Sequence, residues 1–140
     1  MEVMTKEINQ ETDTQGLEFK PYPIADLKLT AKIFDLLQQA LVYKQVKKGI
    51  NETIKMLDKD KVEAVILAAD ADPIELLANM PGLCEERSIP YCFVNQRAGL
   101  GRACGIKRPI ICCCIVKSES SGIEGQIDKM KDEIELLFYS

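Results

Sequence analysis

The amino-acid sequence predicts an α/β domain with helices on both faces of a small sheet. Segments in which apolar residues have helical spacing alternate along the chain with short, nearly continuous apolar runs. Such runs are typical of strands that are buried on both faces. The chain has 140 residues, of which 46% are hydrophobic, and this is enough for one domain with a substantial core.

Helical spacing first appears in residues 31–43, where Thr30 is the expected cap. The apolar face of this helix consists of Ile33, Leu36, Leu37, Ala40 and Leu41. A second helix is predicted over about residues 51–57. Gly49 is interpreted as a hinge between these two helical patterns.

Three apolar runs are predicted to be strands: residues 62–69, 89–94 and 110–116. Between the last two runs, residues 98–105 are expected to form a short glycine-rich helix. The final helix is predicted to start at Ser120 or Ser121, because a stripe of apolar residues with helical spacing follows.

The segment between the first two predicted strands contains helix signals and a break. Asp72 can cap a short helix, 74–79, with Pro73 at its first position. Pro81-Gly82 is interpreted as a break, and residues 83–87 as another helical turn.

The six cysteines are expected to be reduced thiols that act as small buried hydrophobic residues. Cys112, Cys113 and Cys114 are consecutive, so on a strand they point to alternate faces and cannot converge on one ion. There is no C-x-x-C pair and no histidine, which removes the usual zinc spacings and Ser-His or Cys-His catalysis. We therefore expect no metal, no cofactor and no catalytic residue.

The net charge of −4 is unevenly distributed. Residues 1–20 hold five acids and two bases, and residues 117–140 hold six acids and three bases. In contrast, residues 41–55 hold four lysines against Glu52, and residues 95–110 hold four basic residues and no acid. If these two segments meet in space, they form a positive patch that suits a compact RNA site.

Residues 1–20 are predicted to be a disordered acidic tail, and residues 21–140 a folded RNA-binding domain. No apolar run approaches the length needed to span a bilayer, and the beginning of the chain does not resemble a secretory signal. We therefore expect no membrane contact and a location in the cytoplasm or nucleus.

The lysine-rich segment 44–55 is the strongest candidate binding site. The second predicted helix starts here, and unpaired N–H groups at a helix start attract phosphate. Lys47, Lys48 and Lys55 add positive charge. Asn51 and Glu52 can read base edges through an amide and a carboxylate, or they can simply cap the helix and complement its dipole.

Two other patterns allow a different class of function, a small nucleotide-binding protein or hydrolase. Asp70 and Asp72 follow a strand and, with Glu75, could hold magnesium, although capping and loop solvation are favoured over catalysis. Asp72 could also accept a hydrogen bond from a base. Residues 99–105 nearly match the glycine pattern of dinucleotide sites, but the last gap is too long, so a tight packing turn is favoured.

Five motifs occur in the order of a known family: Lys48–Lys55, then residues 68–73, 83–86, 89–91 and 100–105. Together they resemble the kink-turn RNA-binding proteins, which include archaeal and eukaryotic ribosomal members. The likeness covers about residues 21–137. Residues 22–26 and 100–105 favour the branch shared by the spliceosomal U4/U6·U5 tri-snRNP and the box C/D snoRNPs over the box H/ACA relative, although a box H/ACA or ribosomal member remains an alternative.

This resemblance implies a three-layer α-β-α sandwich with a four-stranded mixed sheet. It implies a non-enzymatic scaffold for kink-turn RNA, an internal loop with tandem sheared G·A pairs and one extruded nucleotide. The expected partners are U4 snRNA, box C/D snoRNA and Nop-domain proteins. The expected location is the nucleus, including the nucleolus, and the free protein is expected to be a monomer.

The resemblance also implies which residues bind RNA. Residues of the lysine-rich segment would approach the G·A pairs and nearby phosphates, and the later residues would hold the extruded nucleotide. The set is Lys47, Lys48, Gly49, Asn51, Glu52, Lys55, Asp72, Leu76, Arg97, Ile106, Lys107, Arg108 and Ile111. Three positions depart from the family: Asp72 stands in place of glutamate, Arg97 in place of lysine and Lys47 in place of arginine.

Overall fold

The computed structural model describes residues 19–119 and 121–139, so nearly all of the predicted acidic tail lies outside the described residues. Within the described part, the α-helices are α1 (Leu27–Val42), α2 (Ile50–Asp58), α3 (Met80–Glu86), α4 (Arg97–Ala103) and α5 (Glu124–Leu137). The strands are β2 (Val46–Lys48), β3 (Val62–Ala68), β4 (Tyr91–Val94) and β5 (Cys112–Val116), and η2 (Ile74–Leu77) is a 3₁₀ helix.

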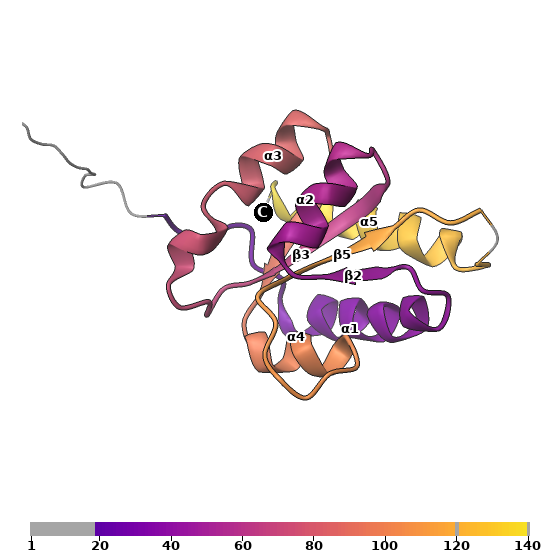
Figure 1. Cartoon of the computed structure of the whole chain (residues 1–140), viewed down its shortest axis with the longest axis horizontal. Coiled ribbons are helices and arrows are strands. Elements are labelled where there is room, and N and C mark those ends of the chain that lie inside the picture. The colour runs from indigo at the N-terminus through magenta and orange to yellow at the C-terminus, as the bar shows by residue number, and fades with distance from the viewer. Residues whose placement is uncertain (1–18, 120, 140) are drawn as a thin grey trace, which may run out of the picture.

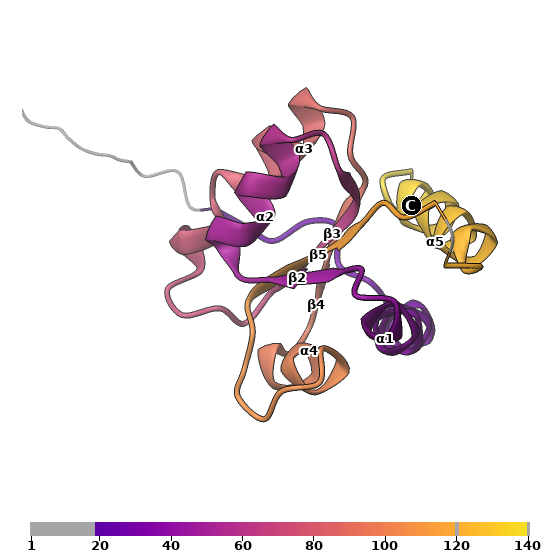
Figure 2. The ribbon, with the colours of Figure 1, turned by 45° about the vertical axis from the view of Figure 1, so that its right-hand side comes forward.

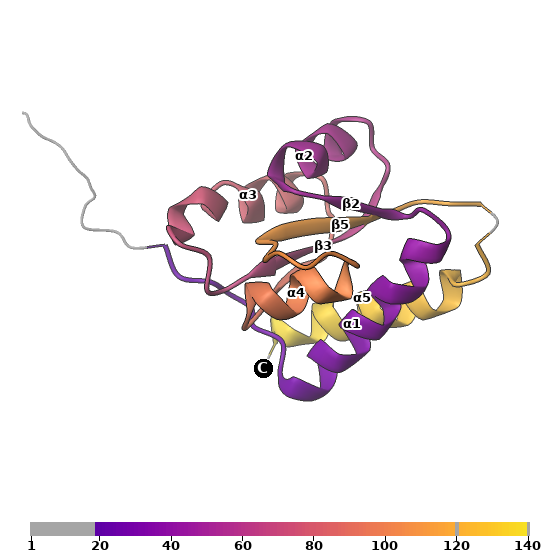
Figure 3. The same cartoon turned by 60° about the horizontal axis from the view of Figure 1, so that its bottom comes forward.

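The four strands form one mixed sheet in the order β2-β5-β3-β4. β4 is parallel to β3, whereas β5 runs antiparallel to both β2 and β3. Helices α2 and α3 cover one face of the sheet, and α1, α4 and α5 cover the other (Figure 2; Figure 3 shows the second group in front of the sheet). The predicted α/β fold with helices on both faces of a four-stranded mixed sheet is confirmed.

Each face of the sheet has its own hydrophobic cluster, and β5 contributes to both. Cys113 packs in the cluster under α1, α4 and α5, whereas Cys112 and Cys114 pack in the cluster under α2 and α3. All three side chains are fully buried. The alternation expected for a strand is therefore confirmed, and the cysteines fill space as small apolar side chains.

Two helix starts differ from the prediction. α1 begins at Leu27 rather than near residue 31, because the Asp26 carboxylate, and not Thr30, caps it by accepting from the Leu29 N–H at 2.8 Å. α5 begins at Glu124, later than predicted. Gly122 precedes this helix with a φ of 79°, a conformation that glycine adopts without strain.

The predictions for residues 72–87 were partly wrong. Asp72 does not cap a helix, and Pro73 precedes η2 with an extended backbone instead of opening an α-helix. The expected break at Pro81-Gly82 is absent, because α3 runs through both residues. Proline fits the first turn of a helix, where its missing N–H would have had no partner in any case.

The prediction also missed β2. Gly49 is not a hinge between two helices, since it joins this three-residue strand to α2. Within the described residues, no helix is both long enough and apolar enough to cross a bilayer.

Candidate nucleic-acid interface

The turn at Gly49 sets the direction of the first turn of α2. The backbone of Gly49 has a φ of 95° and a ψ of 158°, a conformation that residues with a side chain rarely adopt. Its N–H donates to the Cys112 carbonyl at 2.8 Å. Its own carbonyl accepts from the N–H of Thr53 at 3.1 Å and from the hydroxyl of Thr53 at 2.9 Å. Glycine is therefore required where the strand turns into the helix.

Asn51 and Glu52 lie inside the first turn of α2, not before it. Gly49 occupies the cap position, and no side chain accepts a capping hydrogen bond there. The alternative that Asn51 caps the helix is therefore wrong, and its exposed amide is available to a ligand. The Glu52 carboxylate lies 3.4 Å from the Lys55 ammonium, and the two side chains are 45% and 59% exposed.

The residues that lead into β5 bring distant segments together. Three backbone hydrogen bonds join them to the turn before α2, to the end of β3 and to the start of α4. These bonds link Cys112 to Gly49 (2.8 Å), Ile111 to Ala68 (2.9 Å) and Ile110 to Arg97 (3.2 Å). Figures 1 and 2 both place the start of α2, the start of β5 and the loop after β3 along the same edge of the molecule.

A shallow open groove of about 610 Å³ lies at this edge. We call it the α2 groove, and it is lined by Lys48, Gly49, Ile50, Asn51, Glu52, Leu76 and Ile111. Leu76, from η2, is 54% exposed, which is unusual for leucine. The groove thus combines a charged, hydrogen-bonding helix start with two apolar side chains from later in the chain.

Arg97 lies beside this edge and is held by Asp70. The Arg97 N–H donates to the Asp70 carboxylate at 2.7 Å, and its guanidinium donates to the Asp70 carbonyl at 3.0 Å. Asp70 therefore supports the start of α4, in agreement with the capping interpretation. The described residues contain no group of three or more His, Cys, Asp or Glu that could hold a metal ion.

Lys107 and Arg108 lie on the exposed loop between α4 and β5. This loop packs tightly on α4, since a side chain at Gly101 would collide with the backbone carbonyl of Arg108. Ile106 is half-buried against the cluster under α1, α4 and α5, so it holds the loop in place and does not line the α2 groove.

The glycines of α4 serve packing. Gly99 and Gly101 are both buried, and a Cβ on Gly99 would come within 3.1 Å of the Phe34 ring. The backbone of this segment is thus occupied by neighbouring protein atoms. This agrees with the packing interpretation of residues 99–105 and not with a phosphate-binding loop.

The positive charges of β2 extend toward both neighbouring segments. Lys47 and Lys48 pair in register with Cys114 and Cys113, and neighbouring strand residues project to opposite faces. The pKa of Cys104 is held below its usual value by a hydrogen bond with Cys113, and the positive charge of Lys48 contributes. Lys48 is therefore near the end of α4, where the loop with Lys107 and Arg108 begins.

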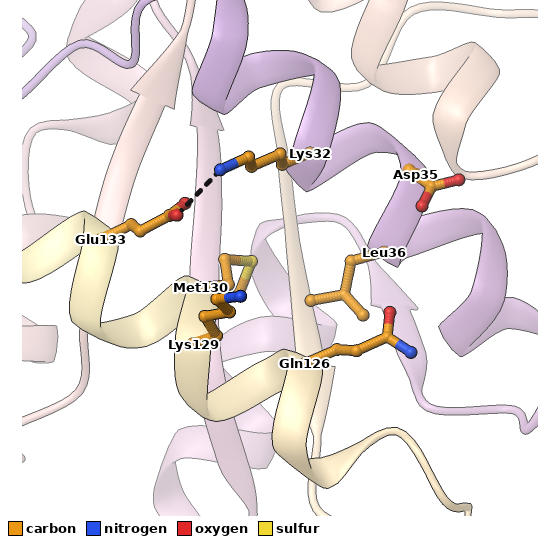
Figure 4. A pocket seen from close by; sticks show the side chains of 7 residues that line it. All are labelled: Lys32, Asp35, Leu36, Gln126, Lys129, Met130 and Glu133. Carbon is orange, nitrogen blue, oxygen red and sulfur yellow. Dashed lines mark hydrogen bonds and ion pairs between the residues drawn. The ribbon is translucent and has the colours of Figure 1, made fainter.

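A second groove has a different character. It lies between α1 and α5 and has a volume of about 180 Å³ (Figure 4). Acidic and basic side chains alternate along it, and the Lys32 ammonium lies 3.0 Å from the Glu133 carboxylate. Because its charges are mixed and partly paired, this groove does not provide the concentrated positive charge that a polyanion requires.

Burial keeps the Cys92 and Cys112 thiols protonated at neutral pH. Burial raises the pKa of Cys92 to about 12. Burial likewise raises the pKa of Cys112 to about 12, although a hydrogen bond with Thr53 opposes the shift. Both groups therefore remain neutral, and neither is a ready nucleophile or metal ligand.

Comparison with known proteins agrees with the fold. Residues 31–124 match the model of the ribosomal protein L7Ae/L30e/S12e/Gadd45 family. The chain belongs to this family. Two similar relatives are the "small nuclear ribonucleoprotein associated homolog 13" of Caenorhabditis elegans and the "NHP2-like protein 1 homolog" of Drosophila melanogaster.

The first of these is 47% identical over 122 residues, which make up 87% of this chain and 95% of the relative. The second is 46% identical over 134 residues, or 96% and 98% of the two chains. Among solved structures, the 15.5kD RNA binding protein of Giardia lamblia matches with a TM-score of 0.80 and 32% identity. This match covers 86% of this chain and 99% of that chain.

Sequence reasoning missed three residues that shape this edge. Ile50 lines the groove, although its apolar character suggested only a core position. Asp70 holds Arg97, and Gly101 seats the basic loop. A signal existed for Asp70, because an aspartate that ends a strand often supports a neighbouring helix start. For Gly101, the packing interpretation of residues 99–105 indicated its role but not its neighbour, the backbone carbonyl of Arg108.

Proposed function

We propose that this protein is a non-enzymatic RNA-binding scaffold that recognises and stabilises kink-turns. The main support is the α2 groove, where the start of α2 faces Leu76 and Ile111 across one edge of the sheet. Membership of a ribosomal-protein family and the printed name of the Giardia structure favour RNA as the ligand. An unstacked, bent RNA loop suits such an edge better than a regular duplex, whose bases are stacked inside.

In this proposal, α2 approaches the sheared G·A pairs. The Glu52 carboxylate accepts hydrogen bonds from guanine amino groups, and the exposed Asn51 amide contacts a neighbouring base edge. Gly49 has no side chain, so the RNA backbone can come close. Lys47 and Lys48 neutralise nearby phosphates. Lys55 exchanges its ion pair with Glu52 for contact with the RNA.

In the same proposal, the extruded nucleotide lies between the apolar side chains of the α2 groove and the loop that joins α4 to β5. Leu76 and Ile111 offer apolar contact to the base, and Lys107 and Arg108 neutralise its phosphates. The Arg97 guanidinium is already positioned by Asp70 and retains free donors. Asp72 is exposed near this position, but it is one methylene shorter than glutamate.

The RNAs proposed for this protein are U4 snRNA and the box C/D snoRNAs. The bound kink-turn and the protein together would form a surface for a Nop-domain protein of the tri-snRNP or snoRNP. The protein would then act in the nucleus and nucleolus, in pre-mRNA splicing and in rRNA processing and 2′-O-methylation. The name of the Caenorhabditis relative, which refers to small nuclear ribonucleoproteins, supports this assignment.

A gel shift tests the proposal with a kink-turn oligonucleotide and a variant of it in which the G·A pairs are replaced by Watson–Crick pairs. Tight binding to the first and weak binding to the second is expected, because protein binding selects the kinked form. Equal affinity for both RNAs would refute kink-turn recognition. Failure to bind either RNA would refute the whole proposal.

Glu52→Ala tests the central contact. Loss of a base-edge contact is expected to weaken kink-turn binding by about 1–3 kcal/mol. The exposed Glu52–Lys55 ion pair contributes only about 0.3–0.5 kcal/mol to folding, so the variant should remain folded. Unchanged RNA affinity would remove Glu52 from the interface.

Lys48→Ala tests the phosphate contacts and has a matched control. The variant should bind less tightly, and the slope of log affinity against log salt should fall by about one unit. Lys129→Ala, which removes a lysine from the groove of Figure 4, should leave both quantities unchanged. A similar effect of both substitutions would mean that only overall charge matters.

The bound RNA distinguishes this branch from the box H/ACA and ribosomal members of the family. Affinity purification from nuclear extract followed by RNA sequencing should recover U4 snRNA and box C/D snoRNAs. Recovery of box H/ACA or ribosomal RNA alone would move the protein to another branch while retaining kink-turn binding.

A further inference from the structure

The excess negative charge of the chain lies in the segment that precedes Phe19. Residues 1–18 hold five of the 22 acidic residues and only one of the 18 basic residues. The remaining residues, 19–140, therefore carry 17 acidic and 17 basic side chains and have no net charge. A strongly acidic segment is thus attached to an electrically balanced body.

The basic residues at the α2 groove have uncompensated charge. Lys32, Arg87 and Lys131, on other surfaces, each form an ion pair at 3.0 Å. Four basic residues on the segments that flank the groove, like several basic residues elsewhere on the surface, form no ion pair with any residue that the structure describes. We call them the basic face, and they are Lys47, Lys48, Lys107 and Arg108.

The described chain starts close to this surface. The Phe19 ring lies 6.1 Å from the Phe93 ring and packs against the same cluster as Ile74 and Ile111. Figures 1 and 3 place this start beside the segment that joins β3 to α3, which contributes Leu76 to the α2 groove. The first described residue, to which the acidic segment is joined, therefore lies on the groove side of the molecule.

The length of the acidic segment and its covalent attachment to the domain allow it to reach the basic face. Eighteen residues can span up to about 60 Å when extended, at roughly 3.3 Å per residue. A short tether also holds its charged groups near the body at an effective concentration on the order of millimolar. Even a weak interaction between the acidic segment and the basic face would therefore be present in a substantial fraction of the molecules.

We propose that residues 1–18 form an intramolecular acidic competitor that occupies the basic face and lowers the affinity of the protein for RNA. The contact itself depends only on this chain, whereas its consequence for RNA rests on the proposed function. A competitor lowers every apparent RNA affinity by the same factor. Weak, non-specific complexes are therefore lost first, and tight kink-turn complexes persist.

Paramagnetic labelling of the free protein tests the contact. A nitroxide on Thr12→Cys reacts selectively, because all six native cysteines are buried. At low salt it should broaden the amide NMR signals of Lys48 and Lys107 more than those of Lys32 and Lys129 in the groove between α1 and α5. The matched control keeps the label but changes the five acids of the segment to Gln or Asn, and the selective broadening should disappear.

Broadening that is equal at the two surfaces, or that survives neutralisation of the acids, would overturn the contact. This measurement needs no RNA, so its result stands even if the protein does not bind kink-turns.

The effect of the acidic segment on RNA affinity is then tested by RNA titration of the unlabelled proteins. Neutralisation of the five acids should tighten kink-turn binding about three- to tenfold at 50 mM salt, and the gain should disappear at 500 mM salt.

An unchanged affinity at 50 mM salt would overturn the role of competitor, even if the contact is observed. A gain that persists at 500 mM salt would also overturn it, because an electrostatic contact would then not be the cause. Absence of RNA binding by both proteins would refute the proposed function and leave the contact to be judged by the NMR result alone.

Discussion

Replacing Gly49 by alanine should separate backbone strain from steric conflict. A Cβ at this position meets no atom within 4 Å, so the substitution creates no collision. The whole effect should come from the φ of 95° and ψ of 158°, a region that only glycine adopts readily. Holding another residue there costs about 1–3 kcal/mol.

Gly82→Ala is the matched control, because a Cβ at Gly82 also meets nothing within 4 Å, but Gly82 lies inside α3 with an ordinary φ. This substitution should stabilise the protein by roughly 0.5–1 kcal/mol, since alanine loses less conformational freedom in a helix. With an m value of about 2 kcal/mol/M, the urea midpoint should fall by about 0.5–1.5 M for Gly49→Ala and rise slightly for Gly82→Ala.

Urea unfolding followed by circular dichroism measures both midpoints. If Gly49→Ala is as stable as Gly82→Ala, the argument from backbone conformation is wrong. The same variants then report on RNA. Gly49→Ala should weaken kink-turn binding because relief of the strain moves the first turn of α2, whereas Gly82→Ala should bind like the parent.

Three further predictions concern stability. Gly101→Ala should lower the free energy of unfolding by at least about 1–3 kcal/mol, because the new Cβ collides with a backbone carbonyl; a soluble, equally stable variant would contradict this packing. Asp70→Ala should cost about 0.5–2 kcal/mol through loss of the bond from the Arg97 N–H, whereas Asp72→Ala should change the midpoint little. Burial raises the pKa of Cys92 to about 12 from an ordinary value of 9, so the folded state holds its proton at pH values where the unfolded state loses it. The free energy of unfolding should therefore fall as pH rises above about 9, by up to about 1.4 kcal/mol per pH unit for this thiol. Between pH 8 and pH 10, the urea midpoint of Cys92→Ala should fall less than that of the parent protein.

The sheet core and the longer helices were predictable because burial imposes a strong pattern on them. β3 has nearly continuous burial and was predicted within one residue, and the alternate placement of Cys112–Cys114 followed from strand geometry alone. Helix starts were less predictable. Asp26 and Thr30 are both good caps in the sequence, and only the packing of the first turn of α1 selects between them.

The candidate site was predictable as residue types but not as a surface. β2 has only three residues, two of them lysines, and no alternation marks it as a strand. Its pairing with β5 nevertheless brings Gly49 to Cys112 and closes the α2 groove. The partly buried position of Ile106 was likewise invisible, because a packed isoleucine and an exposed isoleucine look the same in a sequence.

The hydrogen bonds of residues 110–112 to Gly49, Ala68 and Arg97 have a consequence for newly made protein. All the residues that line the α2 groove except Ile111 precede β5 in the chain, and their arrangement is completed when that strand inserts between β2 and β3. A nascent or damaged chain without this strand displays the same lysines but offers RNA no shaped cavity. Completion of the sheet and formation of the α2 groove are therefore one event.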